Sequence, residues 1–238
     1  MTNPHRVALY YAPEADDPLW QAGTSWLGRD PETDEFVAPP ALLAAHSPDV
    51  TAEPAAYGLH GTLKPPFRLA QGVDYAAFVA GAAQLARGIR PFALPPLSLD
   101  LLDGFLALRE SAPCLDLQAL ADLVVAAMDR MRAPPTEAEL ARRRRHPLAP
   151  EQGAMLALWG YPYVFQHFRF HITLTRRLTS EEAAVIRPLA EAHFRVALAE
   201  ASPRWVRSLA VFTQEAPGAP FRLATRLPLG AMEQADLA

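Results

Sequence analysis

Two stretches of this chain decide its fold and carry its chemistry: Tyr57-Gly-Leu-His60-Gly-Thr62-Leu-Lys64 and Phe168-Arg-Phe-His171-Ile-Thr173-Leu-Thr175. Each stretch places a histidine, one intervening residue and a threonine between apolar residues. Side chains alternate between the two faces of a β-strand. Each stretch is therefore predicted to be a strand with an apolar face for the core and a polar face that carries an imidazole beside a hydroxyl.

The residues that share these polar faces are His60, Thr62 and Lys64 in the first strand and Arg169, His171 and Thr173 in the second. Chance gives about 0.3 His-x-Thr triplets in a chain with 7 histidines and 11 threonines, so one copy would be weak evidence. Two copies stand at matching places in the two halves of the chain, 111 residues apart (171 − 60). This pairing favours a joint role over two unrelated, half-exposed strand histidines.

The predicted elements around the two motifs repeat in the same order. An amphipathic helix follows each motif, over residues 74–87 and 180–193, and two strands follow each helix, over residues 92–94, 97–108, 195–199 and 205–214. This order predicts an α+β fold of two similar lobes, each a small, mostly antiparallel sheet with helices on one face, and an active-site cleft between them. Residues 1–238 are expected to form one such two-lobed domain, with the lobe boundary near the proline- and arginine-rich residues 133–150.

Composition excludes several classes of protein. A net charge of -4 and a pI of about 6.0 argue against binding to duplex DNA through bulk positive charge. The single cysteine, Cys114, excludes an internal disulfide framework and a cysteine-rich metal site. No apolar run reaches about 18 residues, and the first residues lack a signal-peptide pattern. We therefore expect a cytoplasmic protein without contact to a membrane.

The paired motifs resemble those of the 2H phosphoesterase superfamily, which includes 2′,3′-cyclic phosphodiesterases of RNA and other hydrolases of cyclic phosphates. The resemblance extends over most of the chain, through residues 7–13, 59–66, 159–163 and 170–175. This combination is most similar to a bacterial branch of unknown function whose genes accompany phosphonate-degradation genes. The resemblance implies a phosphodiesterase with His60, Thr62, His171 and Thr173 as catalytic residues.

Elementary chemistry agrees with this resemblance. Opening a cyclic phosphodiester needs a base at the attacking oxygen and an acid at the leaving oxygen. His60 and His171 suit these roles, because an imidazole with an ordinary pKa near 6.5 is available in both protonation states near neutral pH. The hydroxyls of Thr62 and Thr173 can donate hydrogen bonds to the non-bridging oxygens, where negative charge accumulates. We expect no metal and no other cofactor.

Four further residues are candidates for substrate binding. Lys64 and Arg169 would contact phosphate if they face the cleft, or they are solvated charges at a strand edge. Tyr10 is a candidate for the cleft wall, with a position in the core equally open. Arg143 belongs to the run Arg142–Arg145, which is either a solvated helix end or a basic flap over the substrate.

The sequence also bears on other kinds of site and on the choice of substrate. His167 and His171 have the spacing of a helical zinc pair, but they lie in a predicted strand and no glutamate follows His167. The chain contains no Walker phosphate loop and no nucleophile elbow. The expected substrate is a small phosphorylated molecule, which the acidic balance favours. Processing of RNA 2′,3′-cyclic phosphate ends and non-catalytic binding of a phosphorylated ligand or an RNA end remain alternatives.

Overall fold

The computed structural model describes residues 3–46, 49–143, 147–199 and 203–230. The strands are β1 (Arg6–Tyr11), β2 (Gly61–Phe67), β3 (Phe92–Leu94), β4 (Leu97–Leu102), β5 (Phe105–Glu110), β6 (Ile172–Thr173), β7 (Arg204–Val206), β8 (Ser208–Gln214) and β9 (Arg222–Pro228). The α-helices are α1 (Pro18–Leu27), α2 (Ala41–His46), α3 (Ala52–Ala55), α4 (Tyr75–Arg87), α5 (Leu115–Met128), α6 (Glu137–Arg143), α7 (Pro150–Trp159) and α8 (Ser180–Leu198). None of these helices is long and apolar enough to cross a membrane.

The two motif strands lie side by side in the centre of the main sheet. Seven antiparallel strands form this sheet in the order β4-β5-β6-β2-β1-β8-β9, and β3 pairs with β7 separately. The motif strands β2 and β6 pair through Gly61 and Ile172. The histidine motifs, far apart in the sequence, are therefore neighbours in space.

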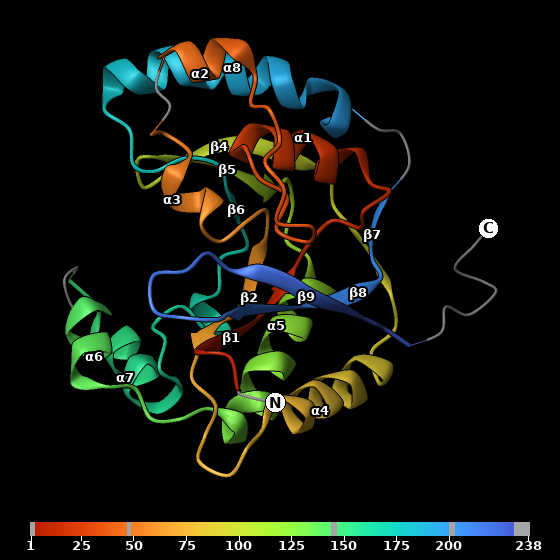
Figure 1. Ribbon diagram of the computed structural model, residues 1–238, viewed down its shortest axis with the longest axis vertical. Helices are drawn as coiled ribbons and strands as arrows, with labels where there is room; N and C mark the ends of the chain where they lie inside the picture. Colours follow the sequence, from red (N-terminus) through yellow and green to blue (C-terminus); the bar gives the residue numbers. More distant parts are fainter. Residues whose placement is uncertain (1–2, 47–48, 144–146, 200–202, 231–238) are drawn as a thin grey trace.

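Helices pack on the two parts of the sheet that meet at β2 and β6. Helices α4 and α5 pack on the part that contains β2, β8 and β9, whereas α8 packs on β4 and on α1. Figure 1 shows α2 and α8 above the strands and α4 below them. The predicted α+β class is confirmed. Strand β6 follows residues 133–150 but stands between β5 and β2, which precede them, so the chain crosses between the two parts of the sheet.

Three elements differ from the sequence prediction in their extent. The second motif stretch, expected to be a strand throughout, is reduced to β6, and Phe165–His167 before it forms a 3₁₀ turn. Strand β2 continues beyond its motif through Pro65 and Pro66. Of the residues of β2, Gly61 pairs with β6, so the two prolines lie beyond this ladder, where a missing N–H costs no bond to β6.

Helix α8 is longer than predicted and begins with a different cap. It continues to Leu198 through the strand expected over residues 195–199. The sequence pattern of Ser180 followed by two glutamates predicts Ser180 as the cap, but the cap is Thr179, with reciprocal bonds between Thr179 and Glu182 in a capping box. The apolar run of residues 196–199 is too short to distinguish a strand from a helix end.

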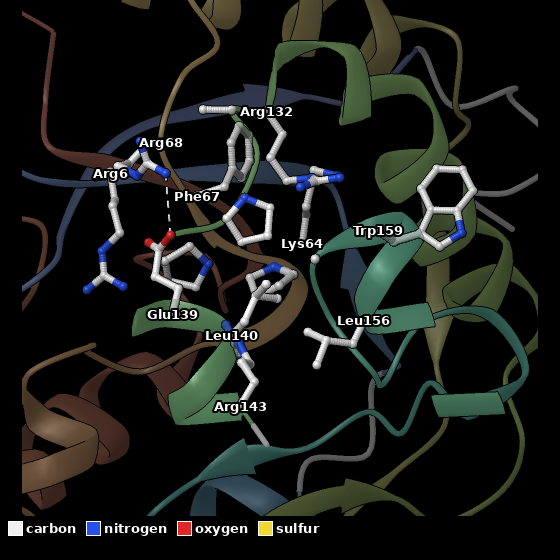
Figure 2. Close-up of a pocket in the computed structure, with 15 residues that line it drawn as sticks. Arg6, Lys64, Phe67, Arg68, Arg132, Glu139, Leu140, Arg143, Leu156 and Trp159 are labelled. Atoms are coloured by element: carbon white, nitrogen blue, oxygen red, sulfur yellow. Dashed lines mark hydrogen bonds and ion pairs between the residues drawn. The ribbon is translucent and has the colours of Figure 1, made fainter. Parts of the chain in front are cut away.

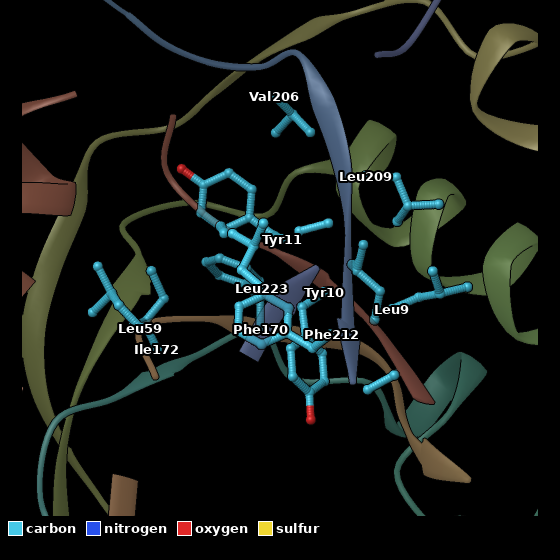
Figure 3. Packing of buried hydrophobic residues seen from close by; sticks show 14 of the residues in the cluster. Leu9, Tyr10, Tyr11, Leu59, Phe170, Ile172, Val206, Leu209, Phe212 and Leu223 are labelled. Carbon is cyan, nitrogen blue, oxygen red and sulfur yellow. The ribbon is translucent and has the colours of Figure 1, made fainter. Parts of the chain in front are cut away.

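Buried aromatic side chains pack on both faces of the central strands. Tyr10, Tyr11, Phe170 and Phe212 are each at most 1% exposed. The hydroxyls of Tyr10 and Tyr11 point in opposite directions in Figure 3, as expected for neighbours on a strand. Tyr10 contacts Phe212 on one face, and Tyr11 contacts Phe170 on the other.

The residue between His60 and Thr62 must be small. A Cβ atom at Gly61 would lie 2.4 Å from Cε2 of the buried Phe170. We expect Gly61→Ala to lower the free energy of unfolding by about 1–3 kcal/mol through overpacking, measured by urea denaturation. Gly153→Ala in α7 is the matched control, because no atom lies within 4 Å of its added Cβ. An unchanged urea midpoint in Gly61→Ala would show that Phe170 does not limit this position.

Candidate active site

The two motifs form a square of four side chains across β2 and β6. Because Gly61 pairs with Ile172 in an antiparallel ladder, His60 lies opposite Thr173, and Thr62 lies opposite His171. Directly opposite Cβ atoms are about 4.5–5.5 Å apart and diagonal neighbours about 7–8 Å apart. The register therefore puts each threonine beside the histidine of the other motif and sets the two histidines on a diagonal, which leaves room for a phosphate between them.

A solvent-open cavity of about 630 Å³ lies over this square. The polar and aromatic side chains that line it are Tyr10, Glu53, Tyr57, His60, Thr62, Phe105, Arg143, Tyr161, Thr173, Thr175, Arg176 and Arg177. His171 is not one of the lining residues. Its ring centroid lies 5.7 Å from that of Phe105, which does line the cavity. The structure thus brings His60, both motif threonines and Tyr10 to the cavity, with His171 beside its wall.

The same backbone contact orients both imidazoles. Nδ1 of His60 is 2.9 Å from the carbonyl oxygen of Gly58, and Nδ1 of His171 is 2.8 Å from that of Arg169. A carbonyl oxygen accepts only, so Nδ1 carries the proton in each ring and Nε2 is left to exchange protons. Nε2 of His60 lies 3.2 Å from the hydroxyl of Thr62. Both motifs therefore present an Nε2 atom for acid–base chemistry.

Burial lowers the pKa of both histidines, and it does so more strongly for His60. Burial lowers the pKa of His60 to about 4, the bond to Gly58 opposes this shift, and the charge of His171 adds to it. The pKa of His171 is lowered as well, first by burial and then by the charge of Arg109, against the bond to the Arg169 carbonyl. In the free protein, His60 is the histidine held more firmly in its neutral form.

Tyr10 packs directly on the first histidine. Its ring stacks on that of His60 with centroids 3.9 Å apart. The hydroxyl of Tyr10 is buried and has no hydrogen-bond partner among the described residues, although the side chain lines the cavity. Burial raises the pKa of this phenol well above its ordinary value. Tyr10 is therefore a protonated phenol whose hydroxyl lies buried at the cavity wall without a hydrogen-bond partner among the described residues.

Lys64 does not share the cavity with His60 and Thr62. Leu9 pairs with Lys64 and Tyr10 with Thr62, so Leu63 is an extra residue on β2 that changes the alternation of the strand. The ammonium of Lys64 donates to the Val125 carbonyl at 3.0 Å and to Asp129 at 3.2 Å. Burial lowers its pKa to about 8, against the attraction of Asp129. The prediction that Lys64 shares a strand face with His60 and Thr62 is wrong, because β2 contains a bulge at Leu63.

The two candidate arginines differ in position. The side chain of Arg169 is exposed and does not line the cavity, whereas its carbonyl oxygen orients His171. Arg143 lines the cavity, and its guanidinium lies 4.5 Å from the ring centroid of Tyr161. Arg144 and Arg145 of the arginine run lie outside the described residues, and Arg143 is the residue of this run that the structure places at the site.

Three arginines near the site were missed by the sequence analysis. Ala107 pairs with Thr173, which places Arg109 opposite His171, and Asp100 accepts a bond from Arg109 at 2.9 Å. Arg176 and Arg177 line the cavity from the loop after β6. The residues that share a face of β5 with Arg109 are Phe105 and Ala107, both apolar, so no local pattern marks Arg109 as a site residue. In the described part of the chain, no group of three His, Cys, Asp or Glu side chains could hold a metal ion.

Comparison with known proteins places this chain in a family. Residues 62–222 match the family described as "Protein of unknown function (DUF1045)". The chain belongs to the DUF1045 family. It is also 40% identical over 239 residues to a protein of Janthinobacterium sp. (strain Marseille) and 38% identical over 218 residues to one of Laribacter hongkongensis (strain HLHK9). Both are named "Ribose 1,5-bisphosphate phosphokinase PhnN".

The DUF1045 chain spans about half the length of these curated relatives, with 98% and 92% of the chain aligned to 52% and 50% of theirs. Among solved structures, E. coli LigT complexed with 3′-AMP is similar with a TM-score of 0.46 and 16% identity, over 96% of this chain and all of that one. A structure titled "Crystal structure of phosphoesterase" has a TM-score of 0.43 and 15% identity, over 96% of this chain and 100% of that one.

Proposed function

We propose that this DUF1045 chain is a phosphodiesterase that hydrolyses a cyclic phosphate, with His60 as general base and His171 as general acid. The observation that carries the proposal is the matched pair of imidazoles. Each donates Nδ1–H to the carbonyl two residues earlier, and the register holds the two rings diagonally on one sheet face. A displacement at phosphorus needs such a pair, one group for each of the two reacting oxygens.

The reaction needs one water molecule, the cyclic phosphate and the two histidines. Nε2 of His60 takes a proton from water as the water oxygen attacks phosphorus. The bond from phosphorus to one ring oxygen breaks, and Nε2–H of His171 gives its proton to that oxygen. The product is a phosphomonoester beside a free hydroxyl. The hydroxyls of Thr62 and Thr173 donate to the non-bridging oxygens.

The assignment of base and acid follows from the pKa values. With a pKa lowered to about 4, His60 is neutral at physiological pH and can accept a proton. The pKa of His171 is also lowered, but less than that of His60. An anionic phosphate bound beside His171 raises its pKa again, because the opposite charge stabilises the imidazolium. His171 is therefore the better proton donor.

The names of the relatives suggest the substrate. They are called kinases of ribose 1,5-bisphosphate, they are about twice as long as this chain, and this chain contains no Walker phosphate loop. Opening a cyclic phosphate that bridges O1 and O2 of ribose 5-phosphate, with O2 as leaving group, yields ribose 1,5-bisphosphate. We propose the 1,2-cyclic phosphate of ribose 5-phosphate as substrate, in line with the resemblance to a phosphonate-associated branch.

RNA ends with a 2′,3′-cyclic phosphate are the second candidate substrate. The aromatic rings of Tyr57, Phe105 and Tyr161 line the cavity and could stack on a base. Assays of kcat/KM on a panel of ribose cyclic phosphates, cyclic nucleotides and cyclic-phosphate RNA ends distinguish the two candidate substrates. We expect the highest kcat/KM for the ribose compound, and unchanged rates with EDTA, because histidines move both protons. Tight binding without turnover of any member would favour a non-catalytic binding protein.

The pH profile of kcat/KM tests the histidine assignment in the free enzyme. His60 must be neutral, which holds above a pKa of about 4, and His171 must be charged, which holds below its lowered pKa. We therefore expect a bell-shaped profile with its maximum below about pH 6.5, the ordinary histidine pKa. The profile of kcat should lie at higher pH, because bound phosphate raises both values. A maximum of kcat/KM above pH 8 would contradict the assignment.

A further inference from the structure

A second cavity, of about 40 Å³, lies next to the catalytic one, and its lining is strongly cationic (Figure 2). Its charged lining residues are Arg6, Lys64, Arg68, Arg132, Arg143 and Glu139. These residues come from β1, β2, α6 and the segments that follow β2 and α5, so the fold gathers them from positions far apart in the sequence. These charged side chains come together only in the folded protein and do not form a run of charges along the sequence.

Carboxylates balance only part of this positive charge. Asp129 binds the Lys64 ammonium at 3.2 Å and the Arg132 guanidinium at 2.8 Å. Glu139 lies 3.4 Å from Arg68 and also accepts bonds from Thr136. Arg6 apart, four cations, Lys64, Arg68, Arg132 and Arg143, meet two carboxylates, Asp129 and Glu139, among the described residues that line the cavity or form ion pairs with these cations. Excess positive charge in a partly enclosed cavity stabilises a bound anion.

The cationic cavity and the catalytic cavity share a wall. Pro65, Pro66 and Arg143 line both. In Figure 2, Arg143 lies at the bottom of the view, and Lys64 and Arg132 lie above it. A ligand whose cyclic phosphate lies over His60 can therefore extend past Arg143 and place a second group among these cations.

We propose that the cationic cavity binds a second phosphate of the substrate, a terminal phosphomonoester, while the cyclic phosphate is opened over the two histidines. This inference rests on the proposed function and makes it more specific: the enzyme selects substrates with two phosphate groups. Arginine suits the task, because its planar guanidinium donates two parallel bonds to phosphate oxygens. For a ribose 1,2-cyclic phosphate, this second group is the 5-phosphate.

Two substrates that differ by one group test the subsite. We expect kcat/KM to be at least 100-fold higher for the ribose 1,2-cyclic phosphate that carries a 5-phosphate than for the compound with a 5-hydroxyl. Loss of one charged hydrogen-bond donor costs about 10- to 100-fold in binding. Arg68→Gln should therefore reduce the preference by that factor, mainly through KM. Arg187→Gln is the matched control, because Arg187 is exposed on α8 and lines neither cavity.

A direct binding measurement separates the subsite from catalysis. Lys64 is the only lysine of the chain, so protein labelled with ¹³C-lysine gives a single lysine side-chain signal. Burial holds the pKa of Lys64 at about 8, and a phosphomonoester bound in the cavity should raise it. We expect ribose 5-phosphate to shift the titration of this signal upward in the wild-type protein and in His60→Ala, and much less in Arg68→Gln.

The possible results lead to different conclusions. Equal turnover of the 5-phosphate and 5-hydroxyl substrates would overturn the subsite and leave the proposed function intact. If neither is turned over while ribose 5-phosphate still shifts the Lys64 titration, the reaction is wrong and the phosphate subsite stands. A Lys64 titration that does not respond to ribose 5-phosphate, or responds equally in Arg68→Gln, would overturn the subsite.

Discussion

Replacement of either His60 or His171 by alanine is expected to lower kcat on the cyclic phosphate by about 10²- to 10⁴-fold, the size of a general acid–base contribution. The loss should lie in kcat, because each imidazole exchanges its proton in the transition state. Steady-state kinetics at the pH optimum of the wild-type enzyme measures the effect. His5→Ala is a suitable control, because His5 lines neither cavity.

The double variant shows whether the two histidines act as a unit. If base and acid serve one displacement at phosphorus, removal of both should cost little more than removal of one. Multiplicative losses would indicate two independent contributions. Circular dichroism and urea denaturation of each variant show whether the fold is retained. Full turnover in folded His171→Ala would contradict the mechanism.

The motif threonines carry the second largest expected effect. Thr62 and Thr173 lie opposite His171 and His60, so their hydroxyls flank the place where the phosphate must sit. We expect Thr62→Ala and Thr173→Ala each to lower kcat by up to about 10²- to 10³-fold, as for loss of one donor to a developing oxyanion. The measurement is kcat and KM on the same cyclic phosphate.

Serine variants are the matched controls for the threonines. Thr62→Ser and Thr173→Ser keep the hydroxyl and remove one methyl group, so most of the activity should remain. Equal losses in the serine and alanine variants would assign the effect to packing. Unchanged kcat in both alanine variants would exclude the hydroxyls from the transition state.

The central strands and the pairing of the motifs could be predicted from the sequence, since both depend on local patterns. Apolar residues flank His60 and His171 at strand spacing, and the repeated order of elements indicated that the two strands are equivalent. The structure places those strands next to each other. Tyr10 could be named as a candidate because β1 is a clear apolar strand, whereas its stacking on His60 depends on the pairing of β1 with β2.

Other features depend on contacts that no local pattern contains. The bulge at Leu63 turns Lys64 toward α5, and a single extra residue in a strand leaves no sequence signal. The capping of α8 by Thr179 requires the side chain of Glu182 to fold back. The cationic cavity joins Arg6 with Arg143, from opposite halves of the chain. Such convergence appears only once the sheet is assembled.

The most direct test of the central claim is ³¹P NMR of the 1,2-cyclic phosphate of ribose 5-phosphate, incubated with the protein in the presence of EDTA. We predict that the cyclic phosphate signal is replaced by that of a second phosphomonoester, giving ribose 1,5-bisphosphate, and that His60→Ala and His171→Ala slow this change by about 10²-fold or more. Persistence of the cyclic phosphate with the folded wild-type protein, or equal conversion by the wild-type protein and both histidine variants, would contradict the proposed reaction.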